Sequence, residues 1–264
     1  MLELKNISKT FNAGTVNQKV ALNGLNLTMN EGDFVTVIGG NGAGKSTMLN
    51  AIAGVFQVDT GKILIDGVDV TALPEYKRAK YIGRVFQDPM MGTAATMQIE
   101  ENLALAARRG KPRTLRPGIT KADREFYKEQ LRILDLGLED RMTTKVGLLS
   151  GGQRQALTLL MATLVTPKLL LLDEHTAALD PATAEKVLAL TKKIVAENHI
   201  TCLMITHNIP SALSLGNRTI MMNNGRIVLE LAGAERETMT TEQLLKVFHE
   251  QGVSNDRILF SAES

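Results

Sequence analysis

The chain has 264 residues, of which 44% are hydrophobic and 22% charged, and its net charge is +2 at pH 7. These values are ordinary for a globular protein with a large core, and so small a net charge gives no strong attraction for polyanions. The sequence contains one cysteine, Cys202, within the apolar run 200–205. One thiol cannot form an internal disulfide, which indicates a reducing compartment, and we expect Cys202 to be a buried strand residue.

A membrane-spanning segment is not expected from the sequence. No run approaches the 18 consecutive apolar residues that a spanning helix needs. The first residues, MLELKNISKTF, alternate between apolar and charged side chains and lack the apolar stretch of a signal peptide. We therefore expect the protein to act from the cytoplasmic side of any membrane that it serves.

The first 90 residues predict strands with one helix between them. Leu2, Leu4 and Ile7 indicate a first strand, and an alternating pattern predicts a second at 25–29. A nearly continuous apolar run at 34–38 is typical of a buried parallel strand. After it, apolar residues at helical spacing predict a helix from Lys45. Further strands are predicted at 61–66 and 81–86.

The middle of the chain loses its strand character and the last third regains it. Helices are predicted at 99–108, 121–136 and 152–165. Strands return at 169–172, 200–205, 219–222 and 227–231, with a helix at 182–197 that Pro181 begins. An amphipathic helix is predicted at 241–250. The pattern predicts an α/β domain over 1–235 with a helical insertion at about 90–166, followed by a helix and tail at 236–264.

A basic segment, 108–124, joins two of the predicted helices. Pro112, Pro117 and Gly118 interrupt it, so a long loop is expected. A groove for nucleic acid is one interpretation, but the segment lacks the aromatic residues on which bases stack. A solvated or membrane-proximal loop is favoured, and no nucleic-acid partner is expected.

The most specific motif for nucleotide binding is GGNGAGKST, which follows the strand at 34–38 and opens a helix. It fits the pattern GxxxxGKS (Walker A) at every fixed position. Glycines allow the backbone N–H groups to surround an anion, and the helix adds the positive end of its dipole. Lys45 would place its charge on the phosphates, and Ser46 would bind Mg²⁺. The residues assigned to this loop are Gly39, Asn41, Gly42, Ala43, Gly44, Lys45, Ser46 and Thr47.

Two acidic residues follow the four leucines 169–172. A buried strand would carry Asp173 to its end, where the carboxylate can hold a water of the Mg²⁺ shell. The side chain of Glu174 would contact a water that attacks the terminal phosphate, because phosphoryl transfer depends on positioning and charge stabilisation. A solvated strand end is the alternative for such an acidic pair.

The run LSGGQ, 149–153, precedes a long predicted helix. Small residues at a helix N-terminus form a second site that suits an anion. The residues assigned to it are Ser150, Gly151, Gly152 and Gln153.

In this order, the phosphate loop, LSGGQ and LLLLDE together resemble the ATP-binding subunit of an ABC (ATP-binding cassette) transporter. The resemblance extends from Leu2 to about Leu231. It implies the fold class of a P-loop NTPase, in which a RecA-like α/β core carries an antiparallel β subdomain and an inserted helical subdomain. It also implies ATP and Mg²⁺ as the cofactors and ATP hydrolysis as the reaction.

The resemblance assigns further residues by their motifs. Gln87 in RVFQDP matches a glutamine that senses Mg²⁺ and the attacking water, and His207 in ITHN matches a histidine that contacts the terminal phosphate. Phe11 matches the aromatic position that stacks on adenine, and Val20 would lie under the base; the alternative for Phe11 is a core residue. Asp180 in AALD matches a loop that crosses the dimer interface.

One residue departs from the family pattern. The run DEHTAALD is similar to the family's DEPTSALD, but His175 replaces the proline. Because proline has no chemical role at that position, the change is interpreted as drift within a subfamily and the mechanism is expected to be intact.

In the family two chains pair head to tail, and each LSGGQ closes on the ATP of the other chain. A homodimer with two shared sites is therefore expected. A separate ATPase chain is typical of importers, whose partners are membrane permease subunits and, indirectly, an extracytoplasmic solute-binding protein. The runs GTAATMQIEENLALA and DEHTAAL are similar to subgroups that carry amino acids. An exporter subunit and a soluble ATPase of iron–sulfur assembly are the alternatives, while a regulator without turnover conflicts with Glu174 and His207.

Overall fold

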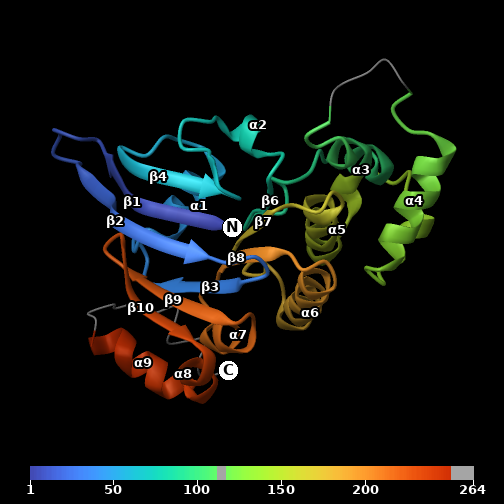
Figure 1. Cartoon of the computed structure of the whole chain (residues 1–264). Helices are drawn as coiled ribbons and strands as arrows, with labels where there is room; N and C mark the ends of the chain where they lie inside the picture. Colours follow the sequence, from blue (N-terminus) through green and yellow to red (C-terminus); the bar gives the residue numbers. More distant parts are fainter. Residues whose placement is uncertain (112–116, 251–264) are drawn as a thin grey trace. The chain divides into compact units, whose positions relative to one another are not determined.

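The computed structural model describes residues 1–111 and 117–250. The chain divides into two units, each with its own packing: unit 1 comprises residues 1–78 and those from 199 onward, and unit 2 comprises residues 79–198 (Figure 1). Unit 1 thus joins the two ends of the sequence, and unit 2 is the stretch between them.

One sheet of unit 1 is antiparallel and has the order β2-β1-β4-β5. Its strands are β1 (Leu2–Phe11), β2 (Lys19–Met29), β4 (Thr60–Ile65) and β5 (Val68–Asp69). Leu4 lies opposite Leu27 on β2 and Ile63 on β4, and all three are buried. Alternation along these strands therefore places one row of side chains in the core.

The other strands of unit 1 follow the order β10-β9-β3-β8. Their bounds are β3 (Phe34–Gly39), β8 (Thr201–Ile205), β9 (Arg218–Asn223) and β10 (Arg226–Ala232). β3 is parallel to both β8 and β9, and every residue of β3 is buried. Its one hydroxyl, on Thr36, donates to the carbonyl of Ala212 at 2.9 Å. The continuous apolar run therefore forms the buried parallel strand that the sequence predicted.

The helices of unit 1 are α1 (Lys45–Ala53), α2 (Glu75–Arg78), α7 (Ile209–Ser214), α8 (Gly233–Thr238) and α9 (Thr241–Glu250). α9 has the bounds that the sequence predicted. Leu244 and Phe248 of α9 are buried in one cluster with Ile38 and Met221 of the sheet. This apolar face attaches the C-terminal helix to unit 1.

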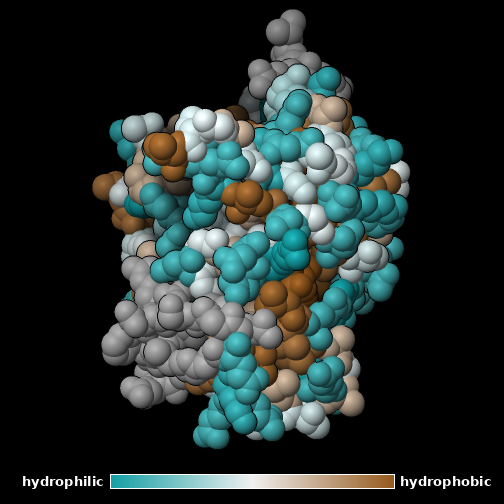
Figure 2. Space-filling model, turned by 90° about the vertical axis from the view of Figure 1, so that its left-hand side faces the viewer, coloured by the Kyte–Doolittle hydropathy of each residue, from teal (hydrophilic) through white to brown (hydrophobic). Residues whose placement is uncertain are grey.

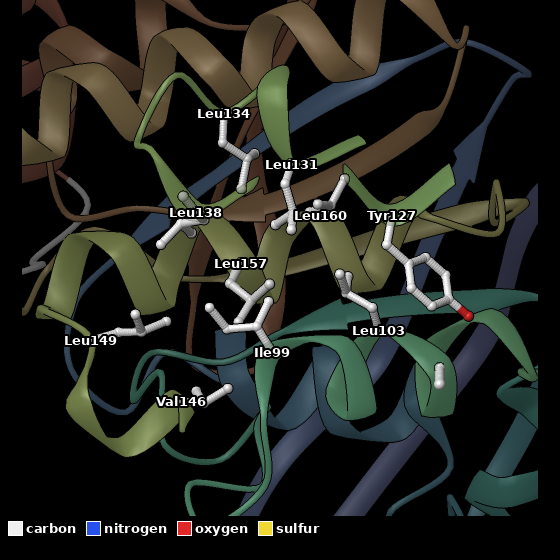
Figure 3. Packing of buried hydrophobic residues seen from close by; sticks show 12 residues of the cluster. Ile99, Leu103, Tyr127, Leu131, Leu134, Leu138, Val146, Leu149, Leu157 and Leu160 are labelled. Carbon is white, nitrogen blue, oxygen red and sulfur yellow. The ribbon is translucent and has the colours of Figure 1, made fainter. Parts of the chain in front are cut away.

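Unit 2 combines a parallel strand pair with helices. β6 (Ile82–Val85) pairs with β7 (Leu169–Asp173). The helices are α3 (Ile99–Ala107), α4 (Lys121–Arg132), α5 (Gly151–Thr163) and α6 (Pro181–Glu197), with 3₁₀ turns η1 (Leu138–Asp140) and η2 (Val146–Leu148). Figure 3 shows the cluster in which Leu157 of α5, Leu103 of α3 and Leu131 of α4 point toward one another.

Two predictions within unit 2 are wrong. The helix predicted at 121–136 ends at Arg132, because Asp135 and Gly137 adopt left-handed backbone conformations with φ of 53° and 65°. The basic segment is also not solvated throughout. The guanidinium of Arg109 donates to the carbonyls of Ala162 and Val165, and burial lowers its pKa. The rest of that segment includes residues 112–116, which lie outside the described residues.

The surface agrees with the composition. The face drawn in Figure 2 is largely hydrophilic, and hydrophobic residues gather in limited areas of it. Within residues 1–111 and 117–250, no helix has both the length and the hydropathy that crossing a membrane requires.

The C-terminal end of α1 is fixed by Arg78, a side chain that sequence inspection did not single out. Arg78 is 1% exposed. Its guanidinium donates to the carbonyls of Ala51 and Ile52 in the last turn of α1, at 2.7 and 2.8 Å, and to those of Leu73 and Thr71, at 2.8 and 2.9 Å. A cation at this end also complements the helix dipole. Arg78 thereby holds the helix that the phosphate loop begins.

We expect Arg78→Met to destabilise the protein, because four carbonyl oxygens lose a donor in a buried site. The free energy of unfolding should fall by about 2–4 kcal/mol. Chemical denaturation measures the change. Lys77→Met is the matched control, since Lys77 is exposed on the same helix; equal stability of the two variants would contradict the assignment.

Candidate functional site

The phosphate loop of unit 1 lies between β3 and α1. Lys45 is 6% exposed, and its Nζ donates to the carbonyl oxygens of Gly39 and Gly40 at 2.7 and 3.0 Å. The ammonium group is therefore held inside the loop by the loop's own backbone. Of the other assigned residues, Asn41, Gly42 and Ser46 are exposed and Thr47 is half-buried.

The N-terminus of α1 differs from those of α4, α5 and α6. Its N-cap is Gly44, and among the described residues no side chain hydrogen-bonds there as a cap. By contrast, Thr120, Ser150 and Asp180 cap α4, α5 and α6 with side-chain oxygens. The first N–H groups of a helix have no partner within it, and a phosphate can take that place. The arrangement thus suits an anion at the start of α1.

Glycine is required at two positions of this loop for reasons of space as well as conformation. Gly39 has φ 152° and Gly44 has φ 102°. A Cβ on Gly39 would lie 2.4 Å from the carbonyl oxygen of Met222, and one on Gly44 would lie 2.5 Å from that of Ala21. The loop therefore packs so tightly against neighbouring backbone that a side chain would displace it.

Three further assigned residues lie in unit 1. Phe11 ends β1 and is half-buried, so it is not a fully buried core residue; its ring packs edge-on against Phe56 with centroids 5.3 Å apart. Val20 of β2 is 49% exposed. His207 is half-buried and follows β8.

Cys202 of β8 is a buried strand residue, as predicted. Burial in an apolar surrounding raises the pKa of its thiol, and so keeps it protonated and unreactive at neutral pH.

In unit 2, β7 presents the two carboxylates. Its four leucines are completely buried, and Asp173 ends the strand half-buried. The next residue, Glu174, is also half-buried and has φ 43°, a left-handed conformation that is costly for a non-glycine residue. The chain therefore turns abruptly at the acidic pair.

Gln87 follows β6 and is exposed. The residue before it is fixed from α5, because the buried side chain of Gln155 donates through Nε2 to the carbonyl oxygen of Phe86 at 3.3 Å. The sequence gave no sign of this contact. It links the glutamine segment to the helix that LSGGQ begins.

Ser150 begins α5 with a capping box. Its Oγ accepts from the backbone N–H of Gln153, whose Oε1 accepts from the N–H of Ser150, both at 3.2 Å. Because Oγ accepts in this pair, its own hydrogen can point to an outside acceptor. The seryl hydroxyl and the exposed Gly151 thus lie at a helix N-terminus.

α5 and α6 meet closely at Gly152. A Cβ there would lie 2.2 Å from Cγ2 of Thr183. Thr183 donates its backbone N–H to Asp180 at 3.0 Å, and hydrogen bonds from Thr183 lower the pKa of Asp180. The segment that contains Asp180 and the LSGGQ segment are therefore neighbours in unit 2.

His175, which the sequence analysis interpreted as drift, is a buried residue. It is 2% exposed, and its Nε2 lies 3.0 Å from Oγ1 of Thr191 on α6. Burial lowers the pKa of His175 to about 4. The sequence indicated only that a histidine occupies a position where proline was expected.

A tightly packed phosphate loop before a helix with no side-chain cap, together with a buried strand that ends in two carboxylates, defines a P-loop NTPase. The sequence pattern of the family described as "ABC transporter" matches residues 22–177, and the chain belongs to that family. Its members' cassettes bind and hydrolyse ATP, and so this chain is an ATPase subunit.

Curated relatives agree with this family. The chain is 44% identical over 248 residues to the tyrosine transport ATP-binding protein of Clostridioides difficile (strain R20291), covering 94% of this chain and 98% of that one. It is 37% identical over 233 residues to the methionine import ATP-binding protein MetN of Corynebacterium diphtheriae, covering 86% of this chain but 64% of that protein.

Solved structures confirm the predicted fold class. The ATP-binding cassette MJ0796, in a dimeric post-hydrolysis state bound to ADP and Pi, has a TM-score of 0.75 at 33% identity and covers 88% of this chain and 98% of that chain. The ATP-binding cassette MJ1267 has a TM-score of 0.77 at 27% identity and covers 94% and 98%.

We expect Gly152→Ala to destabilise unit 2, because its methyl group would overlap Thr183, and overpacking costs about 1–3 kcal/mol. Thermal melting measures the effect. Gly151→Ala is the matched control: it adds a methyl group one residue earlier, 3.5 Å from Leu179. Adding Thr183→Ala to Gly152→Ala should restore stability, and failure to do so would show that the close approach does not explain the glycine.

Proposed function

We propose that this chain is the ATPase subunit of an ABC importer for amino acids. The observation that carries the proposal is the 44% identity to a tyrosine transport ATP-binding protein across nearly the whole of both chains. A second relative, at 37% identity, is a methionine import protein. Both names concern transport of amino acids, which argues against the iron–sulfur alternative, and the second name specifies import, which argues against an exporter.

In this proposal the start of α1 binds the phosphates of ATP. Lys45 places its charge on the β- and γ-phosphates, supported by the two loop carbonyls that already accept from it. Ser46 and Gln87 would hold Mg²⁺, and Asp173 would hold a water of its shell, through hard oxygen atoms, the donor type that this ion prefers. The exposed hydroxyl of Ser46 and the exposed amide of Gln87 support this donor set. Phe11 stacks on adenine.

Turnover in this proposal depends on Glu174. Its carboxylate orients and polarises the attacking water, and His207 contacts the γ-phosphate.

The adenine site in this proposal also includes Val20. Its side chain is exposed enough to contact the base on which Phe11 stacks.

The start of α5 binds the ATP held by a second copy of the chain. Two features support this: the seryl hydroxyl of Ser150 can donate outward, and the cassette MJ0796 is similar to this chain and dimeric. Asp180 lies beside this segment and would cross the same interface.

Residues 1–235 form the ATPase domain in this proposal, with the helical insertion at about 90–166.

The dimer works with permease subunits at the cytoplasmic face of the membrane, and a solute-binding protein outside delivers the amino acid. The absence of a membrane-crossing helix from the described residues is compatible with a peripheral subunit.

Lys45→Ala should weaken ATP binding at least about tenfold, because one charge-assisted contact contributes about 1.5–3 kcal/mol. Isothermal titration with ATP and Mg²⁺ measures the affinity. Lys62→Ala, which removes an exposed lysine from β4, is the control and should bind as the wild type does. Unchanged affinity of Lys45→Ala would remove Lys45 from the site.

Glu174→Gln should keep ATP affinity but reduce turnover by about 10²–10⁴, because the amide has nearly the same shape and is a poor proton acceptor. ATP should then hold the dimer closed, which size-exclusion chromatography with ATP would detect. Glu185→Gln, an exposed change on α6, is the control. A monomeric Glu174→Gln protein with full activity would contradict the mechanism.

Uptake itself tests the proposed importer. The complex purified with its permease and reconstituted in vesicles should accumulate labelled tyrosine or another amino acid only with ATP on the side of this subunit. The same vesicles with Glu174→Gln should not accumulate it. Export of the label, or uptake of no amino acid while ATP is hydrolysed, would count against the proposal.

A further inference from the structure

His175 stands next to Glu174, yet the proposed mechanism gives it no role. It is 2% exposed, and Thr191, its neighbour on α6, is completely buried. A polar group buried without a hydrogen bond costs free energy. Here Nε2 of His175 lies 3.0 Å from Oγ1 of Thr191, which in turn donates to the carbonyl oxygen of Val187 at 2.8 Å. The histidine is therefore part of a buried chain of hydrogen bonds.

The number of available hydrogens decides which atom donates in each of these two hydrogen bonds. A threonine hydroxyl has one hydrogen, and in Thr191 it points to Val187. Nε2 of His175 must then carry a hydrogen and donate it to Thr191. This hydrogen bond acts as a tether between His175 and α6.

The tether fixes one end of the segment 174–180. At the other end, Asp180 caps α6 by accepting from the backbone N–H of Thr183 at 3.0 Å. Both ends of the segment are thus bonded to the same helix. Between β7 and this helix, Glu174 adopts φ 43°. A non-glycine residue persists in such a conformation only when its surroundings enforce it.

We propose that His175 is a positioning residue, which holds the turn of Glu174 against α6 through Thr191 and so fixes the direction of the Glu174 carboxylate. The inference rests on the proposed role of Glu174 in turnover. Displacing a reacting group by 1 Å can lower a rate by about 10². Loss of the tether should therefore reduce kcat more than it changes ATP binding, which depends on the loop of unit 1.

Two amide substitutions separate the tether from the volume of the ring. The amide nitrogen of glutamine, like Nε2 of histidine, is three bonds from Cβ, whereas that of asparagine is two bonds away and corresponds to Nδ1. His175→Gln can therefore still donate to Thr191, and His175→Asn cannot. With Mg²⁺ and ATP, we expect His175→Asn to lower kcat about tenfold or more with KM nearly unchanged, and His175→Gln to stay near the wild type.

Thr191→Val tests the other partner, because it removes the hydroxyl and keeps the shape. It should lower kcat to a similar extent, and adding His175→Asn to it should cause little further loss, since both remove one interaction. Thr191→Ser, which keeps the hydroxyl, is the control. Melting temperatures measured in parallel, with assays well below melting, separate positioning from stability.

Three outcomes would overturn the inference. His175 is merely structural if His175→Asn and Thr191→Val melt earlier but keep the wild-type kcat while Glu174→Gln has lost turnover. Donation from Nε2 is irrelevant if His175→Gln loses as much kcat as His175→Asn. If Glu174→Gln itself keeps full turnover, the proposed role of Glu174 fails first, and the inference fails with it.

Discussion

The first turn of α1 presents backbone N–H groups that, within the described residues, no side chain caps, and much of unit 1 serves to hold that turn in place. β3, buried along its whole length, delivers the loop. Gly39 and Gly44 let it pack against the backbone of neighbouring strands. At the opposite end of the helix, the guanidinium of Arg78 donates to the carbonyl oxygens of Ala51 and Ile52. The loop and both ends of α1 are thus held by contacts within unit 1.

The start of α5 is built differently. Ser150 caps one N–H group with its own side chain, so this helix is stable without an anion, yet the hydroxyl hydrogen can still turn outward. Gly152 brings α6 so close that the two helix N-termini are packed as one piece. Gln155, further along α5, reaches the carbonyl before Gln87. α5 therefore begins with one motif, LSGGQ, and contacts the segments of two others, which contain Asp180 and Gln87. A displacement of the N-terminus of α5 would change these contacts.

The sequence predicted the strands other than β5, the order of the motifs and the phosphate loop because these depend on local patterns: apolar runs, glycines and their spacing. It could not predict features that arise from packing between distant segments. The early end of α4 depends on left-handed residues that hydrophobic periodicity does not register. The guanidinium groups of Arg109 and Arg78 donate to carbonyls far away in the sequence, which local patterns do not register. Arg109 was therefore expected in a solvated loop although it is half-buried, and Arg78 was not singled out although it is buried. His175 looked like drift because its partner, Thr191, lies 16 residues further on.

The position of the single cysteine has a practical consequence for measuring motion in this subunit. Cys202 lies on the buried strand β8, and its thiol has a raised pKa, so it offers little thiolate to maleimides or iodoacetamides in the folded state. A cysteine introduced on the surface of either unit would react far faster than the native one. Pairs of fluorophores or spin labels can therefore be attached without first removing a native thiol, and distances between the two units can be followed through the catalytic cycle in a protein whose core is unaltered.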